Sequence, residues 1–320
     1  MDISTRHLRC FLTVARLKSF TQAANELNVS QPSLSVTIQR LEEMLGTQLF
    51  DRNRRKVSLT AVGQEFLGVA NRLLSDFENS IAGVREVIDR RRGVFHVASV
   101  PSVSADFLPR ALETFLAQYP GLNFVLYDAF DEPVGDLVAL GNVDVGLGHS
   151  QTEDGRHDNQ VVTKPIFRDR MVVVCRKDHP LNELKKVSWR DLVSYEFIHA
   201  MREMYLRNLV NHQFASIGHV VLNEGVSVNI FAAGGLIAQG FGITVLPRLS
   251  LPLIGHSDIM TAIPIEDPPV FREINIITRS EVVLSPSAHS FRQHLFDFTN
   301  DWIAGTDTVQ SIEQSISKST

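Results

Sequence analysis

The stretch SFTQAANELNVSQPSLSVTIQRLEEMLG, residues 19–46, decides the fold of the N-terminal part of the chain. Ser19 and Ser30 are typical helix N-caps, each followed by a helical apolar pattern, and Pro32 suits the first turn of the second helix. Gly46 is a natural end for that helix. Two short helices joined by a tight turn predict a helix-turn-helix, whose second helix enters the major groove of DNA.

The outward face of the second predicted helix carries mostly hydrogen-bonding side chains, which suit base edges and phosphates. We expect contacts with double-stranded DNA from Gln31, Pro32, Ser33, Ser35, Thr37, Gln39 and Arg40. Pro32 has no side-chain donor and would pack on a thymine methyl group. The solvated face of an ordinary helical hairpin is the alternative that this segment alone leaves open.

A basic segment follows at residues 49–60, LFDRNRRKVSLT. It places cations between two apolar anchors, as a short β-wing with a basic tip would. We therefore expect Arg52, Arg54 and Arg55 to contact DNA phosphates.

Residues 3–60 resemble the winged helix-turn-helix of LysR-type transcriptional regulators. The run FLTVARLKSFTQAANELNVSQPSLSVTIQRLEEMLGTQLFDRNRRKVSLTAVGQEFL is similar to the family signature almost position by position. One departure is Val36, where many members carry a basic or polar residue, so a direct DNA contact is not expected from it. The resemblance implies a transcription regulator that binds promoter or operator DNA and RNA polymerase.

The charge of the chain is divided unevenly along its length. Up to Arg92 there are 14 cationic and 10 anionic side chains, a charge of +4, and the net charge of −5 then leaves −9 for the remainder. A basic module on an acidic body fits a protein that touches DNA at one end.

One long helix is predicted between the wing and Arg92, because no proline occurs over residues 61–92 and Thr60 is a plausible N-cap. About thirty residues give roughly 45 Å of helix, too long for packing on one small domain. Its apolar stripe indicates a homodimer seam, with packing on the chain's own body as the alternative. In the LysR family this is the linker helix that pairs two subunits. The apolar stripe consists of Val62, Phe66, Val69, Leu73, Phe77, Ile81, Val84 and Ile88.

From Gly93 onward, strand and helix patterns alternate, which predicts a mostly parallel sheet covered on both faces. The expected strands are 94–99, 123–127, 143–148, 171–175, 197–198, 220–222, 243–247 and 273–277, and the expected helices are 107–118, 134–140, 205–216, 227–239 and 288–299.

The body also resembles the LysR effector domain, in the runs VASVPSVSADFLPRAL, GNVDVGLG and AAGGLIAQGFGITVLP. The resemblance implies a two-lobed α/β domain of the periplasmic-binding-protein type. The predicted fold class is therefore α/β, with an all-α-dominated N-terminal winged helix-turn-helix.

Four domains or segments are predicted along the chain: the DNA-binding domain at residues 1–60, the linker helix and hinge at 61–92, the effector domain at 93–302 and a disordered tail at 303–320. Within the effector domain, lobe I would comprise residues 93–163 and 268–302, and lobe II residues 164–267.

The effector should bind between the lobes, where strands end and helices begin. Pro101, Ser102, Val103 and Ser104 follow the first strand of the body and open its first helix. Free N–H groups and hydroxyls there favour an anion, and an N-cap role for Ser102 is the equal alternative.

By resemblance, Asp131 and His149 also border the effector cleft. Some members that bind acidic effectors carry arginine at the second position. A neutral His149 and an acidic Asp131 therefore favour a mono-anionic or amine-bearing effector over a dicarboxylate. Met201 and Met204 are expected to form the opposite wall.

Enzyme signatures are missing from the sequence, which contains no nucleophile elbow, H-E-x-x-H pair, P-loop or C-x-x-C motif. The histidines His179, His212, His219 and His289 are scattered without metal-ligand spacing, and Cys10 and Cys175 read as buried free thiols. We expect no enzymatic activity, no cofactor and no metal.

The predicted function is an effector-responsive transcription regulator that forms a homodimer through the linker helix and a homotetramer from two such dimers. No apolar run approaches the roughly 18 residues of a membrane span and the N-terminus is not signal-like, so a cytoplasmic location without a membrane partner is expected. The alternative is a small-solute-binding protein, which would need export.

Overall fold

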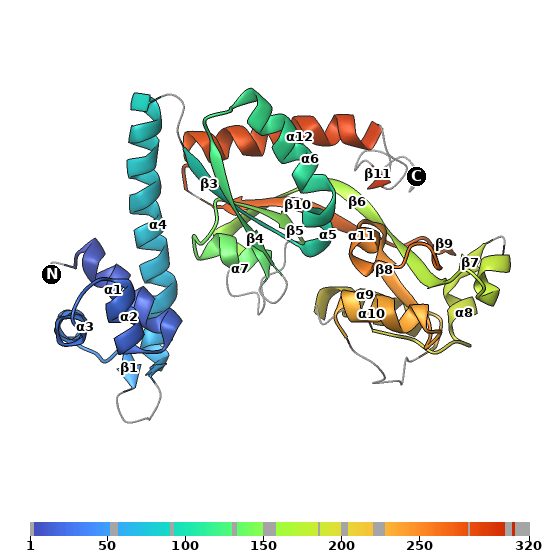
Figure 1. Cartoon of the computed structure of the whole chain (residues 1–320), viewed down its shortest axis with the longest axis horizontal. Helices are drawn as coiled ribbons and strands as arrows, with labels where there is room; N and C mark the ends of the chain where they lie inside the picture. Colours follow the sequence, from blue (N-terminus) through green and yellow to red (C-terminus); the bar gives the residue numbers. More distant parts are fainter. Residues whose placement is uncertain are drawn as a thin grey trace.

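The computed structural model describes residues 3–51, 57–89, 93–129, 133–149, 158–184, 186–199, 204–219, 228–280, 282–304 and 309–310. Its parts are a small N-terminal module, a long helix and a two-lobed body (Figure 1). None of the helices within these ranges is long and apolar enough to cross a membrane.

The N-terminal module combines three helices with a small hairpin. It consists of α1 (Thr5–Leu17), α2 (Phe20–Glu26), α3 (Gln31–Leu45) and the antiparallel strands β1 (Phe50–Asp51) and β2 (Ser58–Leu59). Helices α2 and α3 form the predicted helix-turn-helix, and β1 and β2 form the predicted wing. Both predictions are confirmed.

The residues predicted to begin and end these helices do so. Ser19 Oγ accepts a hydrogen bond from the backbone N–H of Gln22 at 3.3 Å, and Ser30 Oγ accepts one from Ser33 at 3.3 Å. Gly46 ends α3 at φ 70°, a left-handed conformation that glycine adopts without a Cβ clash.

Aromatic rings and one buried carboxylate hold the module together. The Phe11 ring packs against the rings of Phe50 and Phe66, at centroid distances of 5.4 and 5.0 Å. Glu42 is buried in α3, and its Oε1 accepts hydrogen bonds from the backbone N–H groups of Leu49 at 2.8 Å and Phe50 at 3.2 Å. Because these buried donors need partners, the carboxylate fixes the wing to α3.

The predicted long helix is α4 (Ala61–Asp89). Thr60 caps it as expected, since Thr60 Oγ1 accepts a hydrogen bond from the N–H of Gly63 at 2.9 Å. Phe66 and Ala70 join the core of the N-terminal module. The rest of α4 projects from the module toward the body (Figure 1).

Lobe I of the body is a parallel three-stranded unit with helices on both faces. Its strands β3 (Val94–Ser99), β4 (Asn123–Asp128) and β5 (Val145–Gly148) lie in the order β4-β3-β5. Helices α6 and α12 lie on one side of the sheet and α7 on the other (Figure 1). The helices of this lobe are α5 (Pro101–Ala105), α6 (Phe107–Gln118), α7 (Val134–Ala139) and α12 (Pro286–Ala304).

Two long strands, β6 (Val161–Arg176) and β10 (Phe271–Arg279), lie at the crossing between the lobes. They pair antiparallel with one another along residues 161–170 of β6, and β10 also pairs antiparallel with β5. The expectation of a mostly parallel sheet is therefore wrong for its centre. Parallel neighbours need a crossover connection, usually a helix, whereas here the chain passes between the lobes on extended strands.

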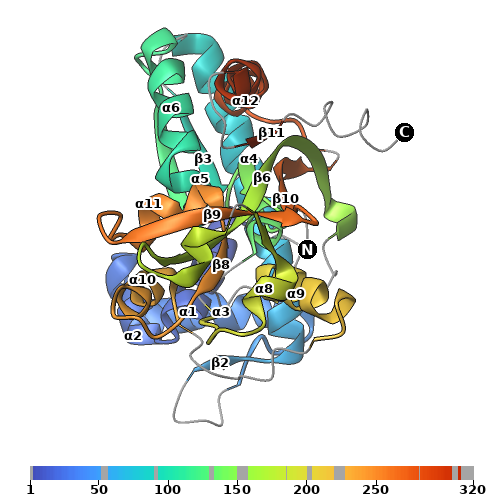
Figure 2. The ribbon, with the colours of Figure 1, turned by 90° about the vertical axis from the view of Figure 1, so that its right-hand side faces the viewer.

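Lobe II begins where β6 changes partners, between Arg170 and Met171. The predicted lobe boundaries, at residues 163–164 and 267–268, stay a prediction. From Met171 onward β6 pairs with β8 on one edge and β9 on the other, and Figure 2 looks onto this lobe. Its elements are β7 (Val187–Ser188), β8 (Thr244–Pro247), β9 (Met260–Asp267), the 3-10 helices η2 (Pro180–Glu183) and η3 (Arg248–Ser250), and the helices α8 (Trp189–Leu192), α9 (Met204–Ser216), α10 (Ile230–Ala238) and α11 (Leu251–Ile254).

Two other sequence expectations in this lobe had different outcomes. The strand predicted at residues 197–198 is a single bridge between Phe197 and Ile243. The strand predicted at 220–222 lies outside the described residues. Cys10 and Cys175 are both buried and free, as predicted.

The C-terminal region differs from the predicted disordered tail at 303–320. Helix α12 continues to Ala304, and β11 (Val309–Gln310) pairs antiparallel with Asp169 and Arg168 of β6. β11 pairs with backbone groups on an edge of β6 that would otherwise lie open at this point. The remaining tail residues, 305–308 and 311–320, lie outside the described ranges.

Adjacent glycines in α10 provide a test of packing in lobe II. A Cβ on Gly234 would lie 2.0 Å from the backbone oxygen of Ile254, whereas a Cβ on Gly235 would meet nothing within 4 Å. We expect Gly234→Ala to lower the free energy of unfolding by about 1–3 kcal/mol, because α10 must move away from α11. Gly235→Ala should raise it by up to about 1 kcal/mol through helix propensity. Urea denaturation of both variants measures this, and equal effects would contradict the close packing.

Candidate DNA interface and interlobe site

Helix α3 buries one side and presents the other to solvent. Leu34, Ile38 and Leu41 are buried in the core of the module. All seven residues of α3 that were predicted to touch DNA lie outside this core stripe. Gln31, Pro32, Ser33, Gln39 and Arg40 are exposed, and Ser35 and Thr37 are half-buried.

Several of these polar side chains hold one another in place. Gln31 Nε2 donates to Ser35 Oγ at 2.9 Å, and Thr37 Oγ1 donates to the backbone oxygen of Ser33 at 2.9 Å. Ordering side chains before a partner arrives reduces the entropy lost on binding. The N-terminal half of α3 is therefore a partly preorganised polar surface.

The wing lies next to this surface in the chain. Phe50 pairs with Leu59 and Asp51 pairs with Ser58, so the hairpin turn falls between Asp51 and Ser58. The predicted phosphate contacts Arg52, Arg54 and Arg55 lie outside the described residues.

A buried ion pair lies at the crossing of the two lobes. Asp169 of β6 and Arg272 of β10 are direct partners across the strands and are 0% and 4% exposed. Arg272 donates to Asp169 Oδ2 from Nε at 3.0 Å and from Nη2 at 2.8 Å. The other carboxylate oxygen accepts a hydrogen bond from the backbone N–H of Leu249 in η3 at 3.2 Å. The pair thus joins both crossing strands to lobe II.

The same guanidinium reaches lobe I through Ser102. Arg272 Nη2 donates a hydrogen bond to Ser102 Oγ, and Ser102 is buried at the start of α5. Val100, not Ser102, is the N-cap of α5, so the N-cap alternative for Ser102 is wrong. The physical reason is that the hydroxyl is used by Arg272 and lies two residues into the helix.

Burial governs the titration of this site. It raises the pKa of the Asp169 carboxyl, while Arg272 and the backbone donors around Asp169 oppose that rise. Burial, and then the Arg272 guanidinium, lowers the pKa of His149 from 6.5 to about 4. His149 is therefore neutral at pH 7, as expected.

The other predicted effector residues are only partly placed. Pro101 and Val103 are buried in α5, and Ser104 is half-buried beside them. Asp131 and Met201 lie outside the described residues, and Met204 begins α9 without a described side chain.

Asp169 and Arg272 are functional-site residues that were not predicted from the sequence. Each is a single charge in a strand of apolar residues, in the runs FRDRMVVV and VFREINII. A lone charge in a buried strand needs a partner, which is the signal that could have identified them. Their pairing could not be read locally, because 103 positions separate them in the chain.

Helix α4 is attached to lobe I by polar contacts. Asp76 Oδ1 lies 2.5 Å from Nη2 of Arg279, the last residue of β10, and Arg72 Nη1 donates to Gln160 Oε1 at 3.1 Å. Gln160 ends η1 (Asp158–Gln160), just before β6. One side of α4 therefore faces the body of its own chain.

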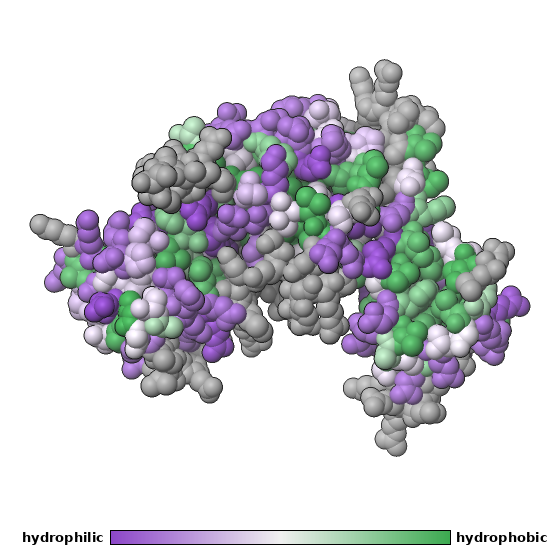
Figure 3. Space-filling view, turned by 180° about the vertical axis from the view of Figure 1, so that it is seen from behind, coloured by the Kyte–Doolittle hydropathy of each residue, from purple (hydrophilic) through white to green (hydrophobic). Residues whose placement is uncertain are grey.

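Another side of α4 is apolar and open. Its large apolar side chains are between 38% and 59% exposed, and Figure 3 shows apolar side chains gathered along α4 and onto the adjoining module. In a single subunit this stripe has no cover, which indicates an interaction surface. It consists of Val62, Val69, Leu73, Phe77, Ile81 and Val84.

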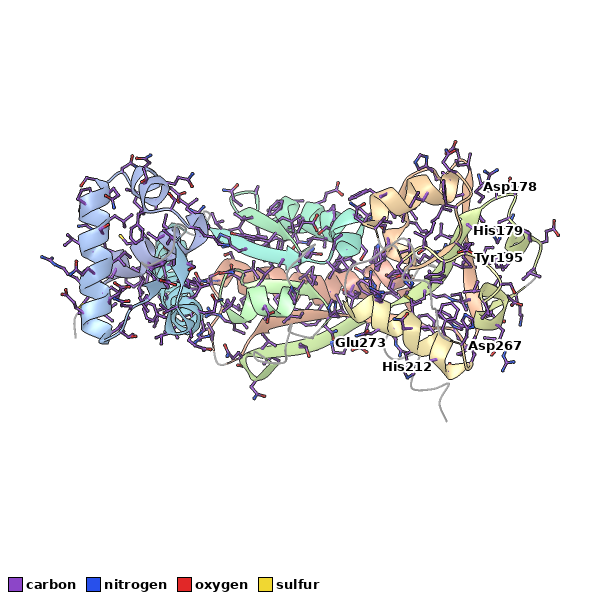
Figure 4. The ribbon with its side chains drawn as sticks, turned by 90° about the horizontal axis from the view of Figure 1, so that it is seen from below. Asp178, His179, Tyr195, His212, Asp267 and Glu273 are labelled. Atoms are coloured by element: carbon purple, nitrogen blue, oxygen red, sulfur yellow. The ribbon has the colours of Figure 1, made fainter. Side chains whose placement is uncertain are left out.

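The labelled histidines of lobe II lie apart from one another (Figure 4). The His179 ring lies 4.5 Å from the Tyr195 ring, centroid to centroid, while His212 is on α9. Within the described ranges, no three His, Cys, Asp or Glu side chains are grouped so that they could hold a metal ion.

Most of the chain is similar to known regulators. Residues 5–64 match the family "Bacterial regulatory helix-turn-helix protein, lysR family", and residues 89–299 match the "LysR substrate binding domain". The "Uncharacterized HTH-type transcriptional regulator YbhD" of Escherichia coli is 30% identical over 92% of this chain and 91% of its own. The "Hca operon transcriptional activator HcaR" of Escherichia coli is 31% identical over 76% of this chain and 81% of its own.

Solved structures share the fold. The crystal structure of CbnR, "a LysR family transcriptional regulator", has a TM-score of 0.69 at 23% identity and covers 93% of this chain and 99% of its own. A second CbnR structure, "complexed with the target DNA complex", has a TM-score of 0.66 at 24% identity and covers 92% of this chain and 100% of its own.

The lowered pKa of His149 predicts a pH dependence of stability. As pH falls below 6.5, His149 is protonated in the unfolded chain, whereas in the folded chain it is protonated only near pH 4. The free energy of unfolding should therefore decrease as the pH is lowered from about 6.5 to about 4. In His149→Gln, about 2–3 kcal/mol of this decrease should be absent at about pH 4.5. Urea denaturation at several pH values measures it. His212→Gln, on the exposed side of α9, is the control; parallel profiles for His149→Gln and the parent would contradict the burial of this imidazole.

Proposed function

The chain belongs to the LysR-type family of transcriptional regulators, and we propose how its residues divide the work of that family. It is a DNA-binding regulator of transcription with a domain for a small-molecule effector. We infer that it has no catalytic role and acts in the cytoplasm, where its DNA lies.

The polar outer face of α3 is the observation that carries the DNA-binding assignment. Gln31 and Ser35 are hydrogen-bonded to one another near the N-terminus of α3, the end that enters the major groove first. In this proposal they read base edges together with Ser33, and Pro32 packs on a thymine methyl group. Thr37, Gln39 and Arg40 continue the same face, and Arg52, Arg54 and Arg55 of the wing contact phosphates.

Two variants separate base reading from phosphate contact. Gln31→Ala should cost about 1–3 kcal/mol on the preferred site and relax sequence choice there. Arg54→Ala should weaken binding to all DNA and reduce the salt dependence by about one counterion. Fluorescence anisotropy with the fragment upstream of the protein's own gene and with random DNA, each titrated against salt, measures both effects.

Arg190→Ala is the control for these variants, because Arg190 is an exposed cation of α8 in lobe II. Unchanged specificity in Gln31→Ala would contradict the assigned reading face. Salt-insensitive or absent binding of the parent to both DNAs would remove the DNA-binding function and favour a solute-binding protein.

The apolar stripe of α4 is proposed to form the homodimer. Six large apolar side chains on one helix would otherwise stay in water, and each buried Leu or Phe contributes about 1.5–3 kcal/mol. A dimer built on α4 carries two recognition helices, one for each half-site of the DNA.

Charged substitutions in the apolar stripe of α4 test its role in dimer formation. The double variant Leu73→Glu, Phe77→Glu should weaken self-association at least about 100-fold, because each subunit would bury two carboxylates between the helices. Sedimentation equilibrium measures the mass. Val283→Glu is the control, since Val283 is 91% exposed in the segment between β10 and α12. An unchanged mass in the double variant would exclude α4 as the dimer seam.

A second surface supports assembly of two dimers into a homotetramer. β4 is an edge strand, and all six of its residues are exposed, including Phe124, Leu126 and Tyr127. An open apolar edge of this kind invites pairing unless it is covered. We propose that the body of another subunit covers it.

The effector is proposed to bind between the lobes, beside Ser102 and His149. Asp169 neutralises Arg272, and His149 carries no charge at pH 7, so these residues suit a neutral or mono-anionic effector better than a dianion. Pro101, Val103 and Ser104 belong to the same wall, and Asp131, Met201 and Met204 are proposed as further lining residues.

Signal transfer is proposed to run along β10. Arg272, near its start, holds the lobe crossing, and Arg279, at its end, holds Asp76 of α4. An effector that favours one lobe arrangement would therefore change the angle of α4, the spacing of the two recognition helices and contact with RNA polymerase.

A further inference from the structure

Val36 is an exposed apolar side chain on the recognition helix. It is 49% exposed, whereas Leu34 and Ile38, two residues before and after it, are 1% and 0% exposed. Residues two apart on an α-helix point to nearly opposite sides. Val36 therefore points straight away from the core of the module, at the centre of the face that would meet DNA.

The surroundings of Val36 leave it as an apolar surface among polar groups. Pro32 lies one turn before it on the same face and is also exposed. On one side of Val36 the polar neighbours are bonded along the helix, Gln31 to Ser35 and Gln39 to Glu43. On the other side, Thr37 Oγ1 donates a hydrogen bond to the backbone oxygen of Ser33. Pro32 and Val36 together form a short apolar strip down the middle of the reading face.

Val36 contributes little to the stability of the free protein. Its χ1 freedom is restricted in a helix, so it is a weaker helix former than Ala, Arg, Lys or Gln. With half of its surface in water, it also contributes little to the core. Its apolar surface is available to a partner.

The major groove of DNA contains an apolar group that Val36 could contact. Among the base edges exposed there, the C5 methyl group of thymine is the apolar feature, and apolar side chains recognise it. We propose that Val36 is a specificity-determining residue that packs against a thymine methyl group. This inference rests on the proposed DNA-binding function and adds a residue to it.

The geometry also sets the spacing of the recognised bases. Four residues of α-helix rise about 6 Å, and successive bases on one strand are about 3.4 Å apart. The thymines read by Pro32 and Val36 therefore lie about two base steps apart or less. Each half-site of the operator should contain both.

Deoxyuridine tests the proposal because it removes only the methyl group. Preferred sites are selected from random double-stranded DNA with the full-length parent protein, and each thymine of one half-site is then replaced singly by deoxyuridine. Binding is measured by fluorescence anisotropy at constant salt. For the parent, we expect about 3–10-fold weaker binding at two neighbouring positions, which corresponds to one lost methyl contact each.

The variant Val36→Ala identifies which of these positions belongs to Val36. It should bind the thymine DNA about 3–10-fold less tightly and be insensitive to deoxyuridine at one of the two positions, while the penalty at the Pro32 position remains. Alanine favours the helix, and circular dichroism and urea denaturation check that the module still folds. Val283→Ala, far from α3 in the chain, is the matched control and should match the parent at every position.

The results distinguish a failure of methyl recognition by Val36 from a failure of DNA binding itself. If Val36→Ala keeps the full penalty of the parent at both positions, or if the parent shows no deoxyuridine penalty, Val36 reads no methyl group and DNA binding stands. If no sequence is enriched and the parent binds no DNA, the proposed function fails and the inference fails with it.

Discussion

The ion pair between Asp169 and Arg272 is the contact on which the two-lobed body depends. Both charges are buried, so each is stable only while the other is present, and loss of one partner from such a pair costs about 3–5 kcal/mol. The pair also orders its surroundings, because Ser102 of lobe I and Leu249 of lobe II bond to it. One buried ion pair is therefore bonded to lobe I, to lobe II and to both crossing strands.

Strand β10 links this ion pair to α4, because it holds Arg272 near its start and Arg279 at its end. It is hydrogen-bonded to β5 on one edge and β6 on the other, which makes it a stiff element. Arg272 and Arg279 are seven residues apart on β10, roughly 23 Å at the usual rise of a strand. The buried site of the lobes and the polar contact with α4 thus belong to one strand, although its pairing with β6 shifts register between Ile274 and Asn275. The apolar side of α4 remains open to a second subunit.

The local parts of this protein could be predicted because their signals lie within a few residues. The bounds of β3 and α6 agree with the prediction, and Ser19, Ser30 and Gly46 act where the pattern placed them. At Ser102 the same logic left an N-cap role open, whereas the Ser102 hydroxyl bonds to Arg272, 170 positions later. The family resemblance likewise gave no reason to expect a DNA contact from Val36, and only its exposure on α3 points to one.

The sequence by itself determined the helix-turn-helix, the wing, the long α4 and the alternating α/β body, since caps, turns and periodicity act over short stretches of chain. Tertiary structure alone decided the antiparallel crossing of β6 and β10, the pairing of Asp169 with Arg272 and the contact of Asp76 with Arg279. These depend on register between segments separated by 103 and 203 positions. No local pattern encodes such a register, because it is fixed only when all the strands of the sheet pack together.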